Sequence, residues 1–140
     1  MNIVAFDPGF TTGVALYGSE SAQLYETTQV EGISGLWDIL HMGAPYDRIV
    51  YESFLYQRRD KVDLRPVEAI GVIKLYAALN SITLVAQTPA TGKRFWTDDK
   101  IKKLNLWEEG QPHAMDAMRH LLYHRTFTLG ENYLLEKLNA

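Results

Sequence analysis

The chain has 140 residues, of which 46% are apolar. This size suits one compact domain with its own core, residues 1–140, and is short for two. The sequence contains no cysteine, which excludes disulfides and thiolate metal sites. The first residues lack the basic flank of a signal peptide, and no apolar run approaches the roughly 20 residues that span a bilayer. We therefore expect a cytoplasmic protein with no membrane partner.

The net charge of −3 is distributed unevenly along the chain. Residues 1–47 contain six acidic residues and no Lys or Arg, whereas residues 48–125 hold 13 of the 14 basic residues against nine acidic ones. Segregated charge of this kind is compatible with a polyanion-binding face on a protein whose other face is acidic. A solvated surface with uneven charge statistics explains the same distribution.

Three strands are expected first. Residues 2–6 are continuously apolar, which is typical of a central strand that is buried on both faces. The runs 12–17 and 23–30 also have strand character and are separated by a turn-rich stretch, which predicts a meander. Residues 34–41 then show helical spacing, and residues 48–51 read as a fourth strand that ends at Glu52.

A polar loop leads from Glu52 to a long helix over about residues 65–79, with Pro66 in its first turn. Gly71 lies in the middle of this helix, where it costs about 1 kcal/mol relative to Ala, and close packing against another backbone would explain it. The remaining expected elements are a strand over 82–86, short helical segments over 89–95 and 98–104, and a last helix from Pro112.

Four polar side chains are expected to meet at one edge of this sheet. Asp7 and Glu52 each end a short apolar strand, and ligands of open α/β sheets bind outside the carboxyl ends of the strands. If the two strands are parallel neighbours, these carboxylates lie side by side. His113 and Asp116 are three residues apart, so they share one face of the last helix near its N-terminus.

Three carboxylates in one pocket repel one another and must take up protons or bind a cation. Oxygen-rich sites with an occasional imidazole suit Mg²⁺ or Mn²⁺ better than Zn²⁺. Two such ions, about 3.5 to 4 Å apart, can bracket a phosphodiester, one activating water and the other stabilising the leaving oxygen. These residue types best support hydrolysis of a nucleic-acid backbone.

Each of these residues also has a purely structural explanation. The stretch 7–9, Asp-Pro-Gly, is ordinary turn chemistry, and Glu52 taken alone is a surface residue at a strand end. His113 and Asp116 can act as a pair that only satisfies the helix end. The joint pattern favours a site. The other histidines are predicted to be surface or packing residues, because no ligand spacing links them to the carboxylates: His41, His120 and His124.

Together, the stretches FDPGFTTG, YESF and HAMDAMRH resemble the RuvC-type Holliday junction resolvases of the ribonuclease H-like superfamily. The resemblance extends to about Arg125. It implies an α/β fold with a five-stranded mixed sheet, three antiparallel strands followed by two parallel ones, flanked by helices. It also implies that Asp7, Glu52, His113 and Asp116 are catalytic and bind two Mg²⁺ ions, for which Mn²⁺ substitutes. The implied partners are a four-way junction in branched DNA, cut by paired nicks, and a second copy of the chain in a homodimer.

The resemblance has departures. The loop after Asp7 is a residue shorter than the usual bacterial form, as in compact phage-encoded relatives, which would place the protein in a host cytoplasm. An aromatic residue just after the catalytic Glu helps to open the junction in the bacterial enzymes, whereas Phe54 and Tyr56 lie on either side of the expected position. Lys93, followed by Arg94, best matches the DNA-contacting basic residues of the family. The loop after Glu52 adds three predicted phosphate contacts, with a solvated loop as the alternative: Arg58, Arg59 and Lys61.

The resemblance also places the long helix at the dimer interface. Gly71 has no side chain, so another helix can approach it closely. Its neighbours are predicted to repeat across a two-fold axis, as an isologous contact requires: Ile70, Ile73, Lys74 and Ala77.

Three alternatives stay open on the sequence. Another ribonuclease H-like nuclease, acting on RNA, flaps or replication forks, would use the same residues, because these contact only a phosphodiester. A non-catalytic nucleic-acid-binding scaffold would keep the fold, although the complete acidic set argues against it. Actin-like ATPases and sugar kinases share an Asp-x-Gly followed by Thr, but they need two such domains, which 140 residues cannot supply. No nucleotide cofactor is therefore expected.

Overall fold

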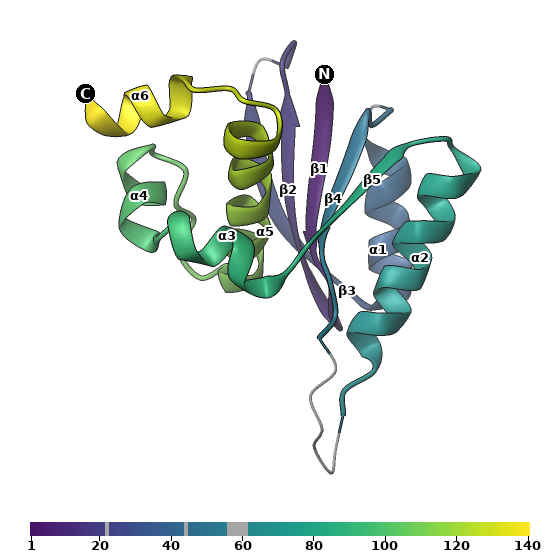
Figure 1. Cartoon of the computed structure of the whole chain (residues 1–140). Helices are drawn as coiled ribbons and strands as arrows, with labels where there is room; N and C mark the ends of the chain where they lie inside the picture. The colour runs from purple at the N-terminus through teal and green to yellow at the C-terminus, as the bar shows by residue number, and fades with distance from the viewer. Residues whose placement is uncertain (22, 44, 56–61) are drawn as a thin grey trace.

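A five-stranded mixed sheet lies between two layers of helices (Figure 1). The structure is a computed structural model and describes residues 1–21, 23–43, 45–55 and 62–140. Its strands are β1 (Asn2–Asp7), β2 (Thr11–Gly18), β3 (Tyr25–Glu31), β4 (Arg48–Glu52) and β5 (Thr83–Gln87), in the order β3-β2-β1-β4-β5. The pairs β1/β2 and β2/β3 are antiparallel, whereas β1/β4 and β4/β5 are parallel. The predicted sheet, three antiparallel strands followed by two parallel ones, is confirmed.

The central strand β1 is buried on both faces. Successive side chains of a strand point to opposite faces of the sheet. Ile3 and Ala5 accordingly join one core cluster, and Val4 and Phe6 join the other. All four side chains are at most 1% exposed, so the continuous apolar run reflects helices on both sides of the sheet.

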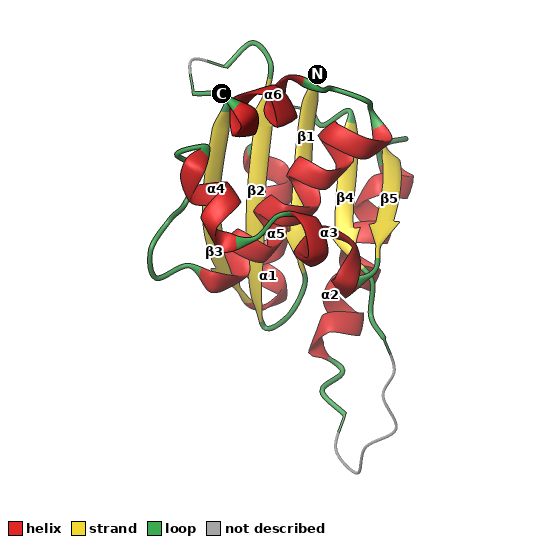
Figure 2. Cartoon of the chain, turned by 60° about the vertical axis from the view of Figure 1, so that its left-hand side comes forward, coloured by secondary structure: helices red, strands yellow, loops and turns green. Residues whose placement is uncertain are grey.

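The helices divide between the two faces (Figures 1 and 2). One face carries α1 (Gly32–Met42) and α2 (Arg65–Leu79). The other carries α5 (Pro112–Tyr123) directly on the sheet, with α3 (Pro89–Phe95), α4 (Asp98–Lys103) and α6 (Tyr133–Asn139) around it. Within the described ranges, none of these helices combines the length and the apolar character that crossing a membrane requires.

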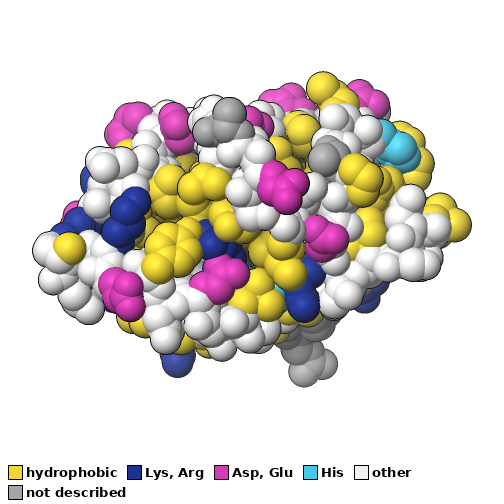
Figure 3. Space-filling view, turned by 90° about the horizontal axis from the view of Figure 1, so that it is seen from above, with side chains coloured by type: hydrophobic (Ala, Val, Ile, Leu, Met, Phe, Trp, Pro, Cys, Tyr) yellow, Lys and Arg dark blue, Asp and Glu magenta, His cyan; other side chains and the backbone are white. Residues whose placement is uncertain are grey.

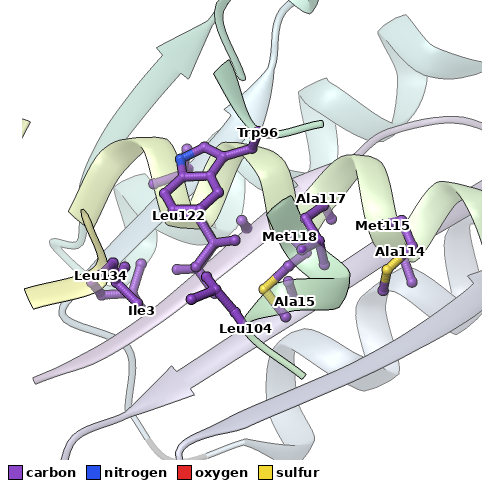
Figure 4. Close-up of a cluster of buried hydrophobic side chains, with 14 of the residues drawn as sticks. Ile3, Ala15, Trp96, Leu104, Ala114, Met115, Ala117, Met118, Leu122 and Leu134 are labelled. Atoms are coloured by element: carbon purple, nitrogen blue, oxygen red, sulfur yellow. The ribbon is translucent and has the colours of Figure 1, made fainter. Parts of the chain in front are cut away.

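Helix α5 rests on the sheet through a continuous apolar stripe (Figure 4). Ala114, Met118, Leu121 and Leu122 are at most 1% exposed, and their spacing places them along one side of the helix. Trp96, the residue that follows α3, is fully buried in the same cluster. The position of α5 over β1 and β2 is therefore fixed by a large apolar contact.

The end of the chain contains elements that the sequence did not predict. A π-helical turn, η1 (His124–Thr128), continues α5 and is followed by α6. Arg125 is 2% exposed and donates to the Tyr133 hydroxyl at 2.6 Å, while its guanidinium lies over the ring of Tyr17. Leu134 and Leu138 join the core cluster beneath α5. Tertiary contacts, rather than a local pattern, hold this segment.

Three of the four neighbours of Gly71 that were predicted to contact a second copy are buried within the chain itself. A Cβ built at Gly71 meets nothing within 4 Å among the described residues, so the position is open on this side and the approach of a partner helix stays a prediction. Ile70, Ile73 and Ala77 are buried against the chain's own sheet and cannot repeat across a two-fold axis. These three residues lie on the face of α2 that packs against the sheet. Of the four residues predicted to contact a second copy, only Lys74 is exposed.

The amino end of β1 lies at the top of Figure 1, and Figure 3 views the molecule from that side. Acidic side chains are scattered over the described part of this end, and its Lys and Arg side chains lie in several separate groups. The carboxyl ends of β1, β4 and β5 point the other way, toward the bottom of Figure 1. That end brings the candidate residues together.

Candidate active site

Asp7 and Glu52 are neighbours at the carboxyl ends of β1 and β4. The two parallel strands pair Phe6 with Tyr51, so the next residue of each strand is a carboxylate at the same edge of the sheet. The side chains of Asp7 and Glu52 are only 11% and 15% exposed. The expected parallel pairing of the first and fourth strands is confirmed, and it creates a largely buried pair of acids.

The turn after Asp7 does not depend on its carboxylate. The Thr12 hydroxyl accepts a hydrogen bond from the Gly9 N–H at 3.3 Å and donates to the Gly9 carbonyl at 3.1 Å. Thr12 therefore closes the turn that the sequence also allowed Asp7 to close. The Asp7 side chain is left for the crevice at the end of the sheet.

Close backbone packing places His113 beside Asp7. Gly13 is paired with Asp7 in the sheet, and a Cβ on Gly13 would lie 1.9 Å from the His113 carbonyl oxygen. Only a glycine lets the start of α5 come this near to β2. The Gln29 side-chain oxygen accepts from the N–H groups of His113 and Ala114 at 2.9 and 3.2 Å, which satisfies two free donors of the helix end. His113 Nδ1 then lies 3.3 Å from Asp7 Oδ2.

Lys93 lies between two of the carboxylates. Its Nζ is 3.3 Å from Glu52 Oε1 and 3.6 Å from Asp116 Oδ2. A second close approach makes this possible, because a Cβ on Gly92 would lie 3.1 to 3.2 Å from the backbone of Arg119 and His120 in α5. Helix α3 is thus pressed against α5, and the lysine that follows Gly92 reaches the crevice.

Asp116 is held by Arg119, one turn further along α5. Arg119 Nη1 donates to Asp116 Oδ1 at 2.7 Å, and Nε donates to the Trp96 carbonyl at 2.8 Å. Its other terminal nitrogen forms an ion pair with Asp98 at the start of α4. The Arg119 side chain is 11% exposed, so Asp116 is oriented by a fixed, largely buried cation.

His120 is also part of the site, contrary to the sequence prediction. Its ring is fully buried, with Nε2 3.1 Å from Glu52 Oε1 and Nδ1 2.8 Å from the side-chain oxygen of Gln87, the last residue of β5. His41 is exposed beside Trp37 and Tyr76, and His124 is buried, so these two are the surface and packing histidines predicted.

The pKa values of Asp7 and Glu52 are shifted in opposite directions, so that this pair of acids carries one proton. Burial raises the pKa of Asp7 to about 8, the charges of Glu52 and Asp116 act in the same direction, and Lys93 partly opposes them. Burial also disfavours the charge of Glu52, but hydrogen bonds with His120 and Asp7 and the charge of Lys93 outweigh it and lower the pKa of Glu52 to about 2. Burial opposes the charge of Lys93 as well, yet Glu52 and Asp116 raise its pKa. Near neutral pH, Glu52 is ionised and Asp7 is protonated.

Both the charges and the donor atoms of the crevice are suited to binding a cation. Asp7 keeps a proton even with Lys93 nearby, so the crevice is short of positive charge. Carboxylate oxygens and one imidazole are donors that Mg²⁺ and Mn²⁺ accept. Among the described residues, no three His, Asp or Glu side chains lie close enough together to hold a metal ion. Lys93 Nζ instead lies between Glu52 and Asp116. Metal binding by this set stays a prediction.

The predicted DNA-contacting residues are placed only in part. Phe54 follows Glu52 and is half-buried against the core, next to a hollow of about 260 Å³ that Pro8, Glu52 and Pro66 also line. Lys93 lies in the crevice, and Arg94 is exposed beside it on α3. The other predicted contacts lie outside the described residues: Tyr56, Arg58, Arg59 and Lys61.

The sequence prediction missed the residues that arrange the acids. Gly13 and Gln29 set the start of α5, Gln87 and His120 hold Glu52, and Arg119 holds Asp116. One signal was available for two of them. Arg119 and His120 are three and four residues after Asp116, at positions that neighbour it on a helix.

Comparison with known proteins identifies the fold. No family model matches the sequence, and no curated protein sequence is significantly similar to it. The structure is similar to that of Thermus thermophilus RuvC, with a TM-score of 0.66 and 17% identity over 93% of this chain and 96% of the other. It is also similar to T. thermophilus RuvC in complex with a Holliday junction substrate, with a TM-score of 0.71 and 18% identity over 94% of this chain and 96% of the other. The chain therefore has the ribonuclease H-like fold of RuvC over almost its whole length.

Proposed function

We propose that this protein is a structure-selective DNA endonuclease that resolves four-way junctions by paired, metal-dependent hydrolysis of phosphodiesters. The observation that carries the proposal is the gathering of three carboxylates and an imidazole at the carboxyl ends of β1 and β4, on a fold shared with RuvC. The solved RuvC complex contains a Holliday junction substrate, which supports branched DNA as the partner of this chain.

The residues that would hold the divalent cations are Asp7, Glu52, His113 and Asp116. Divalent cations supply activation of the attacking water and stabilisation of the leaving oxygen. The chain itself positions the acids. Two strand ends fix Asp7 and Glu52, and Arg119 fixes Asp116.

Lys93 and His113 are the partly exposed cationic and polar groups of the crevice. Their side chains are 43% and 48% exposed, whereas those of the three acids are at most 26% exposed. The Lys93 ammonium can turn from the carboxylates toward a phosphate, which would place positive charge beside the scissile group. His113 is held at Nδ1 by Asp7, which leaves Nε2 for a phosphate oxygen or a water.

We also propose that the protein acts as a homodimer, because two symmetric strands must be cut within one complex. The outer face of α2 offers an apolar stripe for such a contact: Val67, Leu75 and Leu79 are 43%, 55% and 68% exposed. Gly71 and Ala78 lie on the same exposed face and add little bulk. A two-fold contact through this stripe replaces the contact first predicted from Ile70, Ile73 and Ala77.

A supercoiled plasmid that extrudes a cruciform tests paired cutting. With Mg²⁺, the protein is expected to convert the plasmid directly to linear DNA, because both nicks fall within the lifetime of one complex. The same plasmid without the inverted repeat, and a reaction with a chelator, should stay supercoiled. Gel electrophoresis over time measures the three forms.

Two results would contradict this function. Nicked circles as the main early product, or a monomer in sedimentation at micromolar concentration, would replace the dimeric resolvase by a nuclease that tolerates many structures. Equal cleavage of synthetic junctions, flaps, forks and RNA hybrids would do the same.

Lys93→Ala gives a prediction about binding. Loss of one phosphate contact should lower the slope of log affinity against log salt by about 0.9 for duplex arms. The same change removes the cation that neutralises Glu52 and Asp116, so Mn²⁺ should bind more tightly to the DNA-free protein. Lys137→Ala, on the exposed face of α6, is the matched control. Fluorescence anisotropy in a salt series and calorimetry measure the two effects, and an unchanged slope would mean that Lys93 stays paired with the carboxylates and contacts no phosphate.

A further inference from the structure

His120 of α5 contacts the last residues of two neighbouring strands, Glu52 of β4 and Gln87 of β5. Glu52 and Gln87 are paired in the parallel register of β4 and β5, so their side chains start from adjacent positions at the edge of the sheet. The buried ring of His120 contacts both, through Nε2 to Glu52 Oε1 at 3.1 Å and through Nδ1 to Gln87 Oε1 at 2.8 Å. One ring thus joins α5, β4 and β5 behind the crevice.

The amide of Gln87 fixes the orientation of this ring. Gln87 Nε2 donates to the backbone carbonyl of His120 at 3.1 Å, so its Oε1 is the atom that faces the ring. Because an amide oxygen only accepts, Nδ1 of His120 is the donor in that contact. The ring cannot turn without breaking it, and Nε2 is therefore held toward Glu52.

We propose that His120 is a positioning residue for Glu52 and that Gln87 acts through it. This inference rests on the proposed function, in which Glu52 is a ligand of a divalent cation. By holding Oε1, the ring limits rotation of the Glu52 carboxylate and leaves Oε2 as its freer oxygen for the cation. Outer partners that orient a ligating carboxylate in this way raise metal affinity.

His124, the first residue of the π-helical turn that continues α5, is a buried histidine with a packing role only. It lies one turn after His120 and is equally buried, at 0% exposure. Neither of its ring nitrogens has a hydrogen-bond partner among the described residues. His120 differs in that both nitrogens and its own carbonyl are bonded, and all three contacts lead to the two strand ends.

Three substitutions separate positioning from packing. A Gln side chain places its nitrogen near the position of Nε2, whereas an Asn side chain places its nitrogen near the position of Nδ1. His120→Gln therefore keeps a nitrogen toward Glu52, His120→Asn keeps only the partner of Gln87, and His120→Leu keeps neither. His124→Asn is the matched control for loss of a buried imidazole.

The readout is the affinity of each DNA-free protein for Mn²⁺, from the electron paramagnetic resonance of the free ion, together with its melting temperature. We expect His120→Asn and His120→Leu to lose about tenfold or more in affinity, and His120→Gln to keep most of it. The melting temperatures should fall for all three variants without following that order. His124→Asn should keep the affinity of the wild type.

A second measurement uses the intact imidazole. In ¹⁵N-labelled protein, Glu52→Gln should shift the ring resonances of His120 and leave those of His124 in place. Equal Mn²⁺ affinities of the Gln and Asn variants, or an unmoved His120 ring in Glu52→Gln, would overturn the positioning role. A wild-type protein that binds no Mn²⁺ would instead overturn the proposed function, and the resonance shift would still report whether His120 holds Glu52.

Discussion

Replacement of Asp7, Glu52 or Asp116 by its amide is expected to lower the cleavage rate of a four-way junction by at least about a thousandfold. Each amide removes a charge that the divalent cations need, and metal stabilisation of a transition state is worth several kcal/mol, where about 1.4 kcal/mol is tenfold in rate. Binding of the junction without metal should persist or tighten, because Glu52→Gln and Asp116→Asn also remove a negative charge that repels the phosphate, while Asp7→Asn replaces a carboxyl that is already protonated. Single-turnover cleavage and gel-shift assays on the same preparations measure both effects.

The control for these variants is Asp38→Asn. Asp38 lies exposed on α1, on the other side of the sheet from α5. It loses the same charge without touching the crevice, and its cleavage rate should equal that of the wild type. A fully active Asp116→Asn would remove Asp116 from the site and leave Arg119 with a purely structural ion pair.

The sheet was predictable because its signals are local. A continuous apolar run marked β1 as a central strand, and Pro66 and Pro112 marked the starts of α2 and α5. The parallel pairing of β1 with β4 was only a condition for the two carboxylates to meet, and the resemblance to a known family implied the arrangement of the sheet. Such local patterns predict the structure well, because an apolar run directly reflects burial on both faces of a strand and a proline directly reflects the geometry of a helix start.

The arrangement behind the acids was not predictable for a different reason. His120 touches Glu52 from 68 positions along the chain, and Gly13 and Gly92 matter only because another backbone passes over each of them. The same holds for α6, which is fixed by Arg125 and by the burial of Leu134. A sequence pattern gives the faces of an element, whereas these contacts depend on how far two elements approach.

Helix α2 shows that the bounds of an element can be predicted correctly while the contacts of its faces are not. Its expected bounds were correct, and Gly71 was expected to pack closely. The side chains around Gly71 were then assigned to a partner, although the apolar ones face the chain's own sheet. A central glycine indicates an unusual position on a helix but does not say which face it belongs to.

The contribution of Asp7 to the stability of the metal-free protein is expected to fall as the pH rises from about 4 to about 8, whereas the lowered pKa of the buried His124 acts in the opposite sense. The unfolded chain releases the Asp7 proton near the ordinary pKa of 3.8, while the folded protein keeps it up to about 8. At this carboxyl the unfolded state binds fewer protons than the native state in this window, so the contribution of Asp7 to the free energy of unfolding decreases with pH. The lowered pKa of Glu52 acts in the opposite sense and only at lower pH, where stability is lost as the pH falls from 4.5 toward about 2.

Asp7→Asn isolates this effect, because the amide has no proton to lose. Relative to the wild type, the variant should gain stability as the pH rises, by a few kcal/mol at pH 8, since one pKa unit corresponds to about 1.4 kcal/mol. Saturating Mn²⁺ should raise the free energy of unfolding of the wild type but not that of Asp7→Asn. The expected increase is about 2.7 kcal/mol at a hundredfold excess of Mn²⁺ over its dissociation constant. Urea denaturation between pH 4 and pH 8, with a chelator or with Mn²⁺, gives both quantities, and Asp38→Asn should follow the wild type throughout. Parallel pH profiles for the wild type and Asp7→Asn would mean that Asp7 is ionised in the folded protein, and the charge of Lys93 would then be enough to offset the burial of Asp7.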